Sequence, residues 1–142
     1  MKKIINITLS VLLLLAITLN LTACGEKIIA EGLWENATYL SDTTLGEGNK
    51  TLTVEVSAGE NEITLTIKTD KETVGDALLE SKVVEGEDSE YGLFIKKVNG
   101  ITADYNIDQS YWAFYVNGEY ATSGVDSTNI DESAVYKLEY AK

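Results

Sequence analysis

The chain has 142 residues, with 23 acidic and 11 basic side chains, a formal net charge of −12, one cysteine and no histidine. Without histidine, Ser-His-Asp and Cys-His nucleophile systems are excluded, and so is the commonest transition-metal ligand. All the basic residues are lysine, so the basic patch and bidentate arginines that bind phosphate are missing, which excludes nucleic acid as a partner. No spacing of carboxylates singles out an acid and base pair, and we therefore expect a binding protein and not an enzyme.

The first 24 residues predict a secreted lipoprotein. Lys2 and Lys3 precede an apolar run that ends at Leu-Thr-Ala followed by Cys24. This pattern is typical of a lipoprotein signal peptide over residues 1–23, although the apolar run is also long enough for an uncleaved membrane anchor. Similarity to bacterial lipoproteins implies that the Cys24 thiol is lipidated and becomes the mature N-terminus. We therefore expect an extracytoplasmic protein, held on the bacterial cell membrane by acyl chains.

Residues 24–50 carry Gly, Asn, Asp and Ser with little periodicity, which indicates a tether and an irregular lead-in to one domain over residues 51–142. Trp34 and Tyr39 are expected to hold this lead-in against the domain. Two runs then alternate apolar and polar residues around a Gly-containing turn, and together they predict a hairpin over residues 51–70.

The apolar period changes from two to about 3.6 at the next segment, which predicts a short helix beginning near Thr73. Thr73 and Asp76 resemble a capping box with a shortened acid. We predict a loop over residues 84–92, a strand over residues 93–98, a hairpin turning at Asn117 and Gly118, and a closing strand over residues 134–141. This order of strands around one helix predicts an α+β fold.

A polar segment between the strand predicted over residues 93–98 and the following hairpin, "ADYNIDQS", suggests a cation site. Asp104, Asn106 and Asp108 place oxygens at positions 1, 3 and 5, as a calcium-binding EF-hand loop does. The pattern fails further on, because Gln109 stands where glycine is needed and Tyr115 where a glutamate should be. A solvated polar loop and a calcium site using oxygen ligands alone therefore both remain open.

The strand that follows carries aromatic residues on both faces. With Asn117 and Gly118 in the turn, Trp112, Phe114 and Val116 share one face, which we expect to be the core face. The other face carries Tyr111, Tyr115 and Tyr120, whose flat apolar bodies and hydroxyls suit a partly wet site for a large planar ligand. The alternative is that Tyr115 and Tyr120 form an ordinary cross-strand pair.

Several short motifs in this half of the chain are similar to one known family. They are Thr-Val-x-Asp-Ala-Leu at residues 73–78, Tyr91-Gly92, Val98-Asn99-Gly100, Tyr111-Trp112 and Gly124-Val125. In this order they resemble the C-terminal domain of transcobalamin and intrinsic factor, and the transcobalamin-like domains of bacterial surface lipoproteins. The chain departs from that family at Asp131-Glu132-Ser133, where the family usually has Asp-Gly-Asp.

The resemblance implies a β-grasp-like mixed sheet with one short helix packed on a face, and a binding function. Cobalamin or another bulky small molecule would be the ligand, delivered to a membrane transporter, and a second binding protein would complete the site. The alternative function is calcium binding, or a structural interaction at the cell surface. The candidate ligand-binding residues, taken from the tyrosine face and the shared motifs, are Tyr111, Trp112, Tyr115, Tyr120, Gly124 and Val125.

Overall fold

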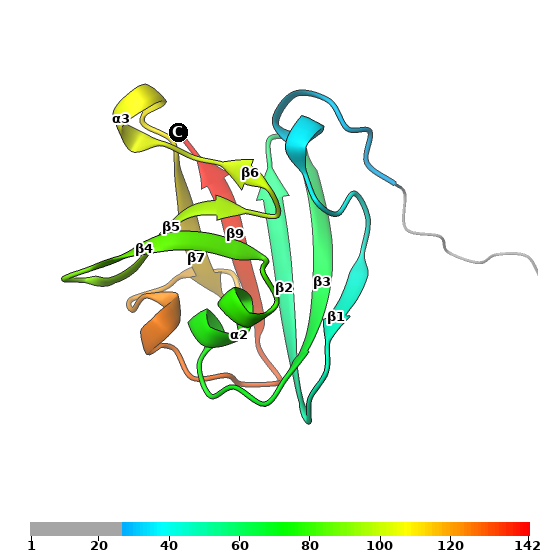
Figure 1. Cartoon of the computed structure of the whole chain (residues 1–142), viewed down its shortest axis with the longest axis vertical. Helices are drawn as coiled ribbons and strands as arrows, with labels where there is room; N and C mark the ends of the chain where they lie inside the picture. Colours follow the sequence, from blue (N-terminus) through cyan, green and yellow to red (C-terminus); the bar gives the residue numbers. More distant parts are fainter. Residues whose placement is uncertain (1–26) are drawn as a thin grey trace, which may run out of the picture.

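A computed structural model describes residues 27–142 of the protein, so the signal peptide and Cys24 lie outside the described residues. The described part consists of a large mixed sheet with a short helix and a smaller sheet packed on one of its faces (Figure 1). This is the predicted α+β architecture with a mixed sheet. No helix within residues 27–142 is long and apolar enough to cross a membrane.

The large sheet has six strands in the order β1-β3-β2-β9-β7-β8. β1 runs parallel to β3 and β2 parallel to β9, and the remaining neighbours are antiparallel. The strands are β1 (Thr43–Gly46), β2 (Lys50–Ala58), β3 (Asn61–Thr69), β7 (Tyr111–Val116), β8 (Glu119–Tyr120) and β9 (Val135–Ala141). Alternate residues of β2 and β3 are buried, which confirms the hairpin predicted from the period-two pattern.

Helix α2 (Val74–Glu80) and the small sheet cover the apolar face of the large sheet (Figure 1). Thr73 caps this helix as predicted, because its hydroxyl oxygen accepts a hydrogen bond from the backbone N–H of Asp76 at 3.1 Å. The small sheet contains β4 (Val84–Ser89), β5 (Gly92–Val98) and β6 (Ile101–Thr102), and the remaining short elements are η1 (Gly32–Asn36), α3 (Tyr105–Asp108) and η2 (Val125–Ser127).

Three segments differ from the sequence-based prediction. The segment over residues 84–92 is not a loop, since it contains β4, which pairs with β5 across a bulge at Glu85 and Gly86. The lead-in contains β1, and the polar segment after β6 contains α3. β4 is exposed after its first residue, and β1 has only four residues, so neither carries the apolar alternation by which a strand is recognised in sequence.

Asn99 holds the lead-in against the small sheet. Its backbone has a positive φ of 51°, and its side chain is 1% exposed. The side-chain amide accepts from the backbone N–H of Tyr39 at 2.8 Å and donates to the carbonyl oxygen of the same residue at 2.9 Å. The backbone N–H of Thr38 donates to the Asn99 carbonyl oxygen at 2.9 Å. The buried Trp34 adds an indole hydrogen bond to the Ala58 carbonyl oxygen at 2.8 Å.

Candidate functional site

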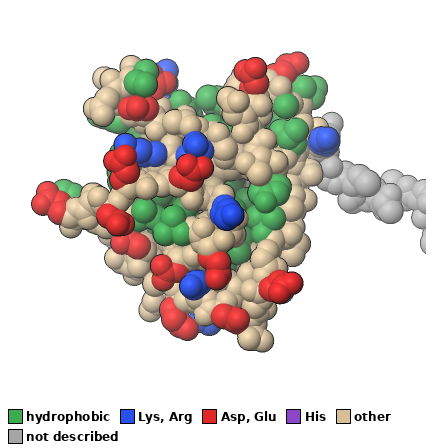
Figure 2. All heavy atoms as spheres, viewed as in Figure 1, with side chains coloured by type: hydrophobic (Ala, Val, Ile, Leu, Met, Phe, Trp, Pro, Cys, Tyr) green, Lys and Arg blue, Asp and Glu red, His purple; other side chains and the backbone are tan. Residues whose placement is uncertain are grey.

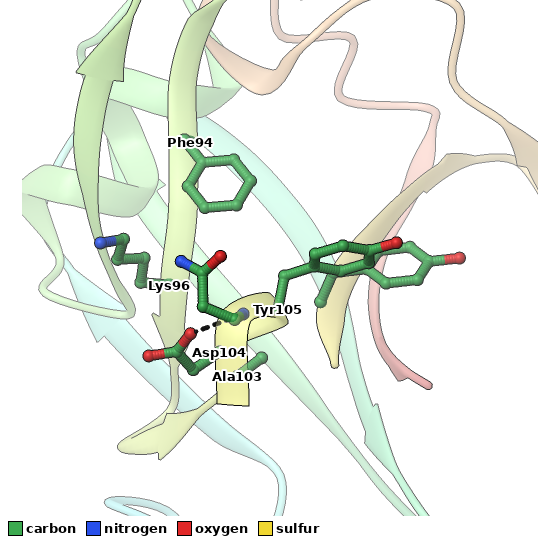
Figure 3. A pocket seen from close by; sticks show the side chains of 7 residues that line it. Phe94, Lys96, Ala103, Asp104 and Tyr105 are labelled. Atoms are coloured by element: carbon green, nitrogen blue, oxygen red, sulfur yellow. Dashed lines mark hydrogen bonds between the residues drawn. The ribbon is translucent and has the colours of Figure 1, made fainter. Parts of the chain in front are cut away.

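Two adjoining cavities lie where β5, α3 and β7 meet, and we call them together the aromatic groove. The helix cavity, of about 470 Å³, is lined by Phe94, Lys96, Ala103, Asp104, Tyr105, Asn106 and Tyr111 (Figure 3). The loop cavity, of about 390 Å³, lies beside the segment that follows β8, and its lining residues are Leu93–Ile95, Tyr111, Trp112, Phe114 and residues 120–125. Phe94 and Tyr111 line both cavities, so the two rings form a shared wall.

The rings of the helix cavity are unusually accessible for aromatic side chains. Phe94 is 48% exposed, Tyr105 59% and Tyr111 38%. They come from β5, α3 and β7 respectively, and Figure 3 shows Phe94 and Lys96 on one strand, with Asp104 and Tyr105 on the turn into the helix. Partly exposed aromatic rings that line one cavity are available for contact with a ligand.

The geometry of α3 places its first residues against the helix cavity. The Asp104 carboxylate caps the helix by accepting from the backbone N–H of Asn106 at 2.9 Å. Gln109 ends the helix in the left-handed conformation, at φ 64°, and the chain then enters β7. Tyr105 and Tyr111 are therefore brought to the same cavity by one short helix and its two caps.

The loop cavity has a more buried aromatic lining. Trp112 is 8% exposed, and its ring packs edge to face with Tyr140 at a centroid distance of 5.6 Å. Phe114 stacks on Tyr136 at 6.1 Å. The indole Nε1 of Trp112 is buried and has no hydrogen-bond partner, which is unusual because buried indole N–H groups are normally paired.

The structure brings together five of the six predicted ligand-binding residues. Tyr111, Trp112, Tyr120, Gly124 and Val125 all line the loop cavity, whereas Tyr115 does not line it. Tyr115 instead pairs with Tyr120 across the strands, edge to face at a centroid distance of 5.3 Å. The cross-strand pair is thus the arrangement that the structure contains, and the groove lies beside the face of Trp112 and Phe114.

Two residues of the groove escaped the sequence analysis as site residues. Phe94 lies in the strand predicted over residues 93–98, and Tyr105 lies in the segment that carries the candidate cation ligands. Their exposure depends on how β5 and α3 pack against β7, so no local pattern distinguishes them from buried aromatic residues. Asp104 was the available signal for the start of α3, because aspartate is favoured at the N-cap.

Two glycines of the shared motifs are explained by contact with Asp126 in η2. Gly92 has a φ of 101°, and a Cβ atom there would lie 2.7 Å from the Asp126 carboxylate. A Cβ atom at Gly124 would lie 2.9 Å from the same carboxylate. Glycine is required at Gly92 by its positive φ, whereas a side chain at Gly124, where φ is −68°, would need only the Asp126 side chain to move.

The three candidate cation ligands have other partners in the structure. The Asp104 carboxylate caps α3, and Asp108 accepts hydrogen bonds from the hydroxyl and the backbone N–H of Ser110. The second oxygen of Asp108 forms an ion pair with the Lys142 ammonium at 3.0 Å. Asn106 lines the helix cavity. Within residues 27–142, no group of three or more acidic, histidine or cysteine residues is arranged to hold a metal ion.

The Asp108 contacts predict a dependence of stability on pH. The Ser110 hydroxyl, and after it the Lys142 ammonium, lower the pKa of Asp108 from 3.8 to about 2. Because the folded-state pKa lies below the unfolded value, the carboxylate stabilises the fold above about pH 4, and this contribution disappears as the pH falls to about 2. Asp108→Asn should therefore be less stable than the parent at pH 6, with the difference shrinking between pH 4 and 2. Urea denaturation at each pH measures it, and a difference that stays constant down to pH 2 would contradict the assignment.

Comparison with known proteins finds similarity over most of the described chain. Residues 71–138 match the model of a domain of unknown function, DUF4430, and this range contains the groove residues. A crystal structure of a "putative metal binding protein" from Ruminococcus gnavus shares 32% identity, with 66% of this chain and 98% of that chain covered and a TM-score of 0.62. The crystal structure of haptocorrin in complex with Cbi is 19% identical in sequence and has a TM-score of 0.46. The match covers 66% of this chain and 25% of the haptocorrin chain. Among curated proteins there is no match.

Proposed function

Since the chain belongs to the same family as the "putative metal binding protein" from Ruminococcus gnavus, we propose that it is a binding module whose aromatic groove holds a bulky small molecule. The observation that carries this proposal is the shared wall of Phe94 and Tyr111, two partly exposed rings between two cavities. Small-molecule sites are concave and mostly apolar, with a few polar groups that orient the ligand. Here Asn106, Thr122 and Ser123 would supply those polar groups.

The proposed ligand is a corrinoid or a molecule of similar bulk. A large ring system could lie across the shared wall and place one part in each cavity, which a small metabolite could not do. The rings of the shared wall are partly exposed, so a ligand there would stay partly exposed, as a module that passes its ligand to a transporter or a second binding protein requires. The proposal is one of binding and not of catalysis, since the chain has no histidine and we expect its one cysteine to be lipidated.

Ligand binding is tested by thermal denaturation of the purified chain with corrinoids, haem and calcium. In the proposed function a corrinoid raises the melting temperature, because a ligand that binds the folded state alone stabilises it. Phe94→Ala and Tyr111→Ala should each weaken binding by about 2 kcal/mol, roughly thirtyfold. Calorimetric titration of each variant measures the loss.

Tyr115→Ala is the matched control for these truncations, because Tyr115 is a tyrosine of the same strand that does not line either cavity. It should bind the corrinoid as the parent does. Tyr111→Phe keeps the ring and removes the hydroxyl, so it separates stacking from hydrogen bonding. If Phe94→Ala and Tyr111→Ala remain folded and bind as tightly as the parent, the groove is not the binding site.

Metal binding is the second candidate, favoured by the description of the related Ruminococcus gnavus protein as metal binding. Asp104, Asn106 and Asp108 are the proposed ligands, and calcium the proposed ion, because only oxygen ligands are available there. Binding would require Asp108 to exchange Lys142 for the cation. In the same denaturation experiment calcium alone should then raise the melting temperature, and the double variant Asp104→Asn, Asp108→Asn should lose that rise. No calcium effect on the parent would exclude this candidate.

We further propose that acyl chains on Cys24 hold the module on the outer face of the cell membrane. The support is the signal pattern ending at Leu-Thr-Ala-Cys, which lies outside the described residues. Two long acyl chains bury enough methylene groups for stable anchoring, at about 0.8 kcal/mol each. Cys24→Ala should abolish incorporation of a fatty-acid probe and leave the signal peptide uncleaved. Unchanged labelling of the variant would contradict the lipid anchor.

A further inference from the structure

We propose that the helix cavity is an aromatic cage for an organic cation, specifically a quaternary ammonium group of the choline type. The inference goes beyond the proposed function, because it assigns a separate ligand chemistry to the helix cavity. A bulky ligand that extends into this cavity and the organic cation would exclude each other, whereas one confined to the loop cavity would not compete. It is carried by two independent features, the aromatic lining of the cavity and the balance of charges around it.

The aromatic lining comes from three elements. Phe94 of β5, Tyr105 of α3 and Tyr111 of β7 line the cavity together (Figure 3). Each ring presents an electron-rich face, and a cation near such a face is attracted more strongly as it loses contact with water. The cavity volume of about 470 Å³ lies within the range of roughly 300–1,000 Å³ typical of small-molecule sites.

The charged groups around the cavity favour a positive ligand. Asp104 lines it, and one of its carboxylate oxygens is held in place by the backbone N–H of Asn106. Lys96 also lines it, but its ammonium is paired with the Glu87 carboxylate at 2.9 Å. These three side chains together carry one net negative charge. Since the chain as a whole carries a net charge of −12, an approaching cation is attracted and an anion repelled.

Neighbouring charges do not reverse this balance. On the same helix, Asp108 is neutralised by its ion pair with Lys142 at 3.0 Å. The lysine next to Lys96 in β5, Lys97, is paired with Glu85 at 3.2 Å. Figure 2 shows the acidic side chains spread across the face that it displays, without a dense cluster. Selectivity for a cation would thus arise from the cavity itself.

The cavity chemistry favours a quaternary ammonium over a hard metal ion. Calcium takes six to eight oxygen ligands, whereas the polar lining side chains of the helix cavity are Asp104, Asn106, Lys96 and one tyrosine hydroxyl on each of Tyr105 and Tyr111. A quaternary ammonium needs no hydrogen-bond acceptors, since it carries no N–H group. Its methyl groups can contact the rings while its charge is balanced by Asp104.

The test compares choline with 3,3-dimethylbutan-1-ol, a neutral molecule of the same shape. The full chain is purified in a sugar-headgroup detergent, and binding is measured by ligand-observed NMR at low salt. Choline should bind at least about tenfold more tightly than the neutral molecule, because the latter keeps only the apolar contacts. Equal affinities would overturn the proposal, since the cavity would then select shape without charge.

Variants of residues that line the helix cavity give a second test, in which two changes of charge should shift the affinity for choline in opposite directions. Asp104→Asn preserves the helix cap, because asparagine caps as well as aspartate does, and it should weaken choline binding severalfold. Lys96→Gln removes the competing positive charge and should strengthen it. Tyr105→Leu keeps a side chain of good helix propensity, removes the ring and should weaken binding by about fivefold or more.

Tyr120→Leu is the control, because this residue lines the loop cavity and not the helix cavity, and it should leave choline binding unchanged. If Asp104→Asn and Lys96→Gln both leave the affinity unaltered, the cation cage is wrong. That result would leave the proposed function standing, because corrinoid binding is measured in a separate experiment with Phe94→Ala and Tyr111→Ala.

Discussion

Trp112→Ala is expected to lower the free energy of unfolding by about 3 to 5 kcal/mol, the range typical of large aromatic residues truncated in a core. Trp112 is 8% exposed, belongs to the hydrophobic core and packs edge to face with Tyr140. Removing its ring would leave a void beside Tyr140 on the face of the sheet, and the sheet cannot fill it because strand pairing fixes the backbone of β7 and β9. Urea denaturation measures the change. A loss below about 1 kcal/mol would show that Trp112 is not a core residue.

Trp112→Phe is the informative companion variant. It retains most of the ring, and it removes the buried Nε1–H that has no partner. An unpaired buried donor costs about 1 to 3 kcal/mol, so the relief should offset much of the lost packing. We therefore expect a far smaller loss than for alanine, and equal losses for the two variants would contradict this account. Trp112→Phe is also the variant suited to ligand titration, since lost binding in an unstable alanine variant would be uninformative.

Asn99→Ala is expected to lower the free energy of unfolding by about 3 kcal/mol. The change removes two side-chain hydrogen bonds to the backbone of Tyr39, and leaving a partly buried donor and acceptor unpaired is costly. It also places alanine at a φ of 51°, where a residue other than glycine or asparagine loses about 1 to 2 kcal/mol. Denaturation measures the total loss in the free energy of unfolding. Amide hydrogen exchange at Thr38 and Tyr39 shows whether the loss arises in the lead-in.

Asn99→Gly separates the two contributions. Glycine adopts positive φ without strain, so this variant loses the hydrogen bonds alone, and its difference from alanine reports the backbone cost. Both variants should increase amide exchange in the lead-in. Unchanged protection of Tyr39 would show that the lead-in is held by Trp34 and not by Asn99.

Local patterns in the sequence predicted most strands of the large sheet, although not the short β1. The alternation in β2 and β3 predicted their hairpin, and the register pairs Leu52 with Ile67 on the buried face. Asn117 and Gly118 both have positive φ, of 50° and 80°, as the type I′ turn predicted for that dipeptide requires. These features could be predicted because the side chains that specify them lie within a few residues of one another.

The inferences from the composition and from the N-terminal pattern also rest on the sequence alone. The absence of histidine and arginine limits the available chemistry in any fold, and the segment ending at Cys24 indicates an anchor through residues that are recognised as a linear signal. Neither inference required a tertiary contact, and the structure of residues 27–142 does not alter them.

Only the tertiary structure decided which aromatic residues form a site. Phe94, Tyr105 and Tyr111 lie on three elements, and they line one cavity because β5 packs against β7 while α3 turns the chain between them. Asn99 likewise bonds to Tyr39, which lies 60 residues earlier in the chain. An aromatic residue in a short apolar segment has the same local pattern whether it becomes buried or exposed, because burial depends on elements distant in sequence. Local sequence therefore determined the β2–β3 hairpin and the turn before β8, and the packing of the small sheet on the large one determined the groove.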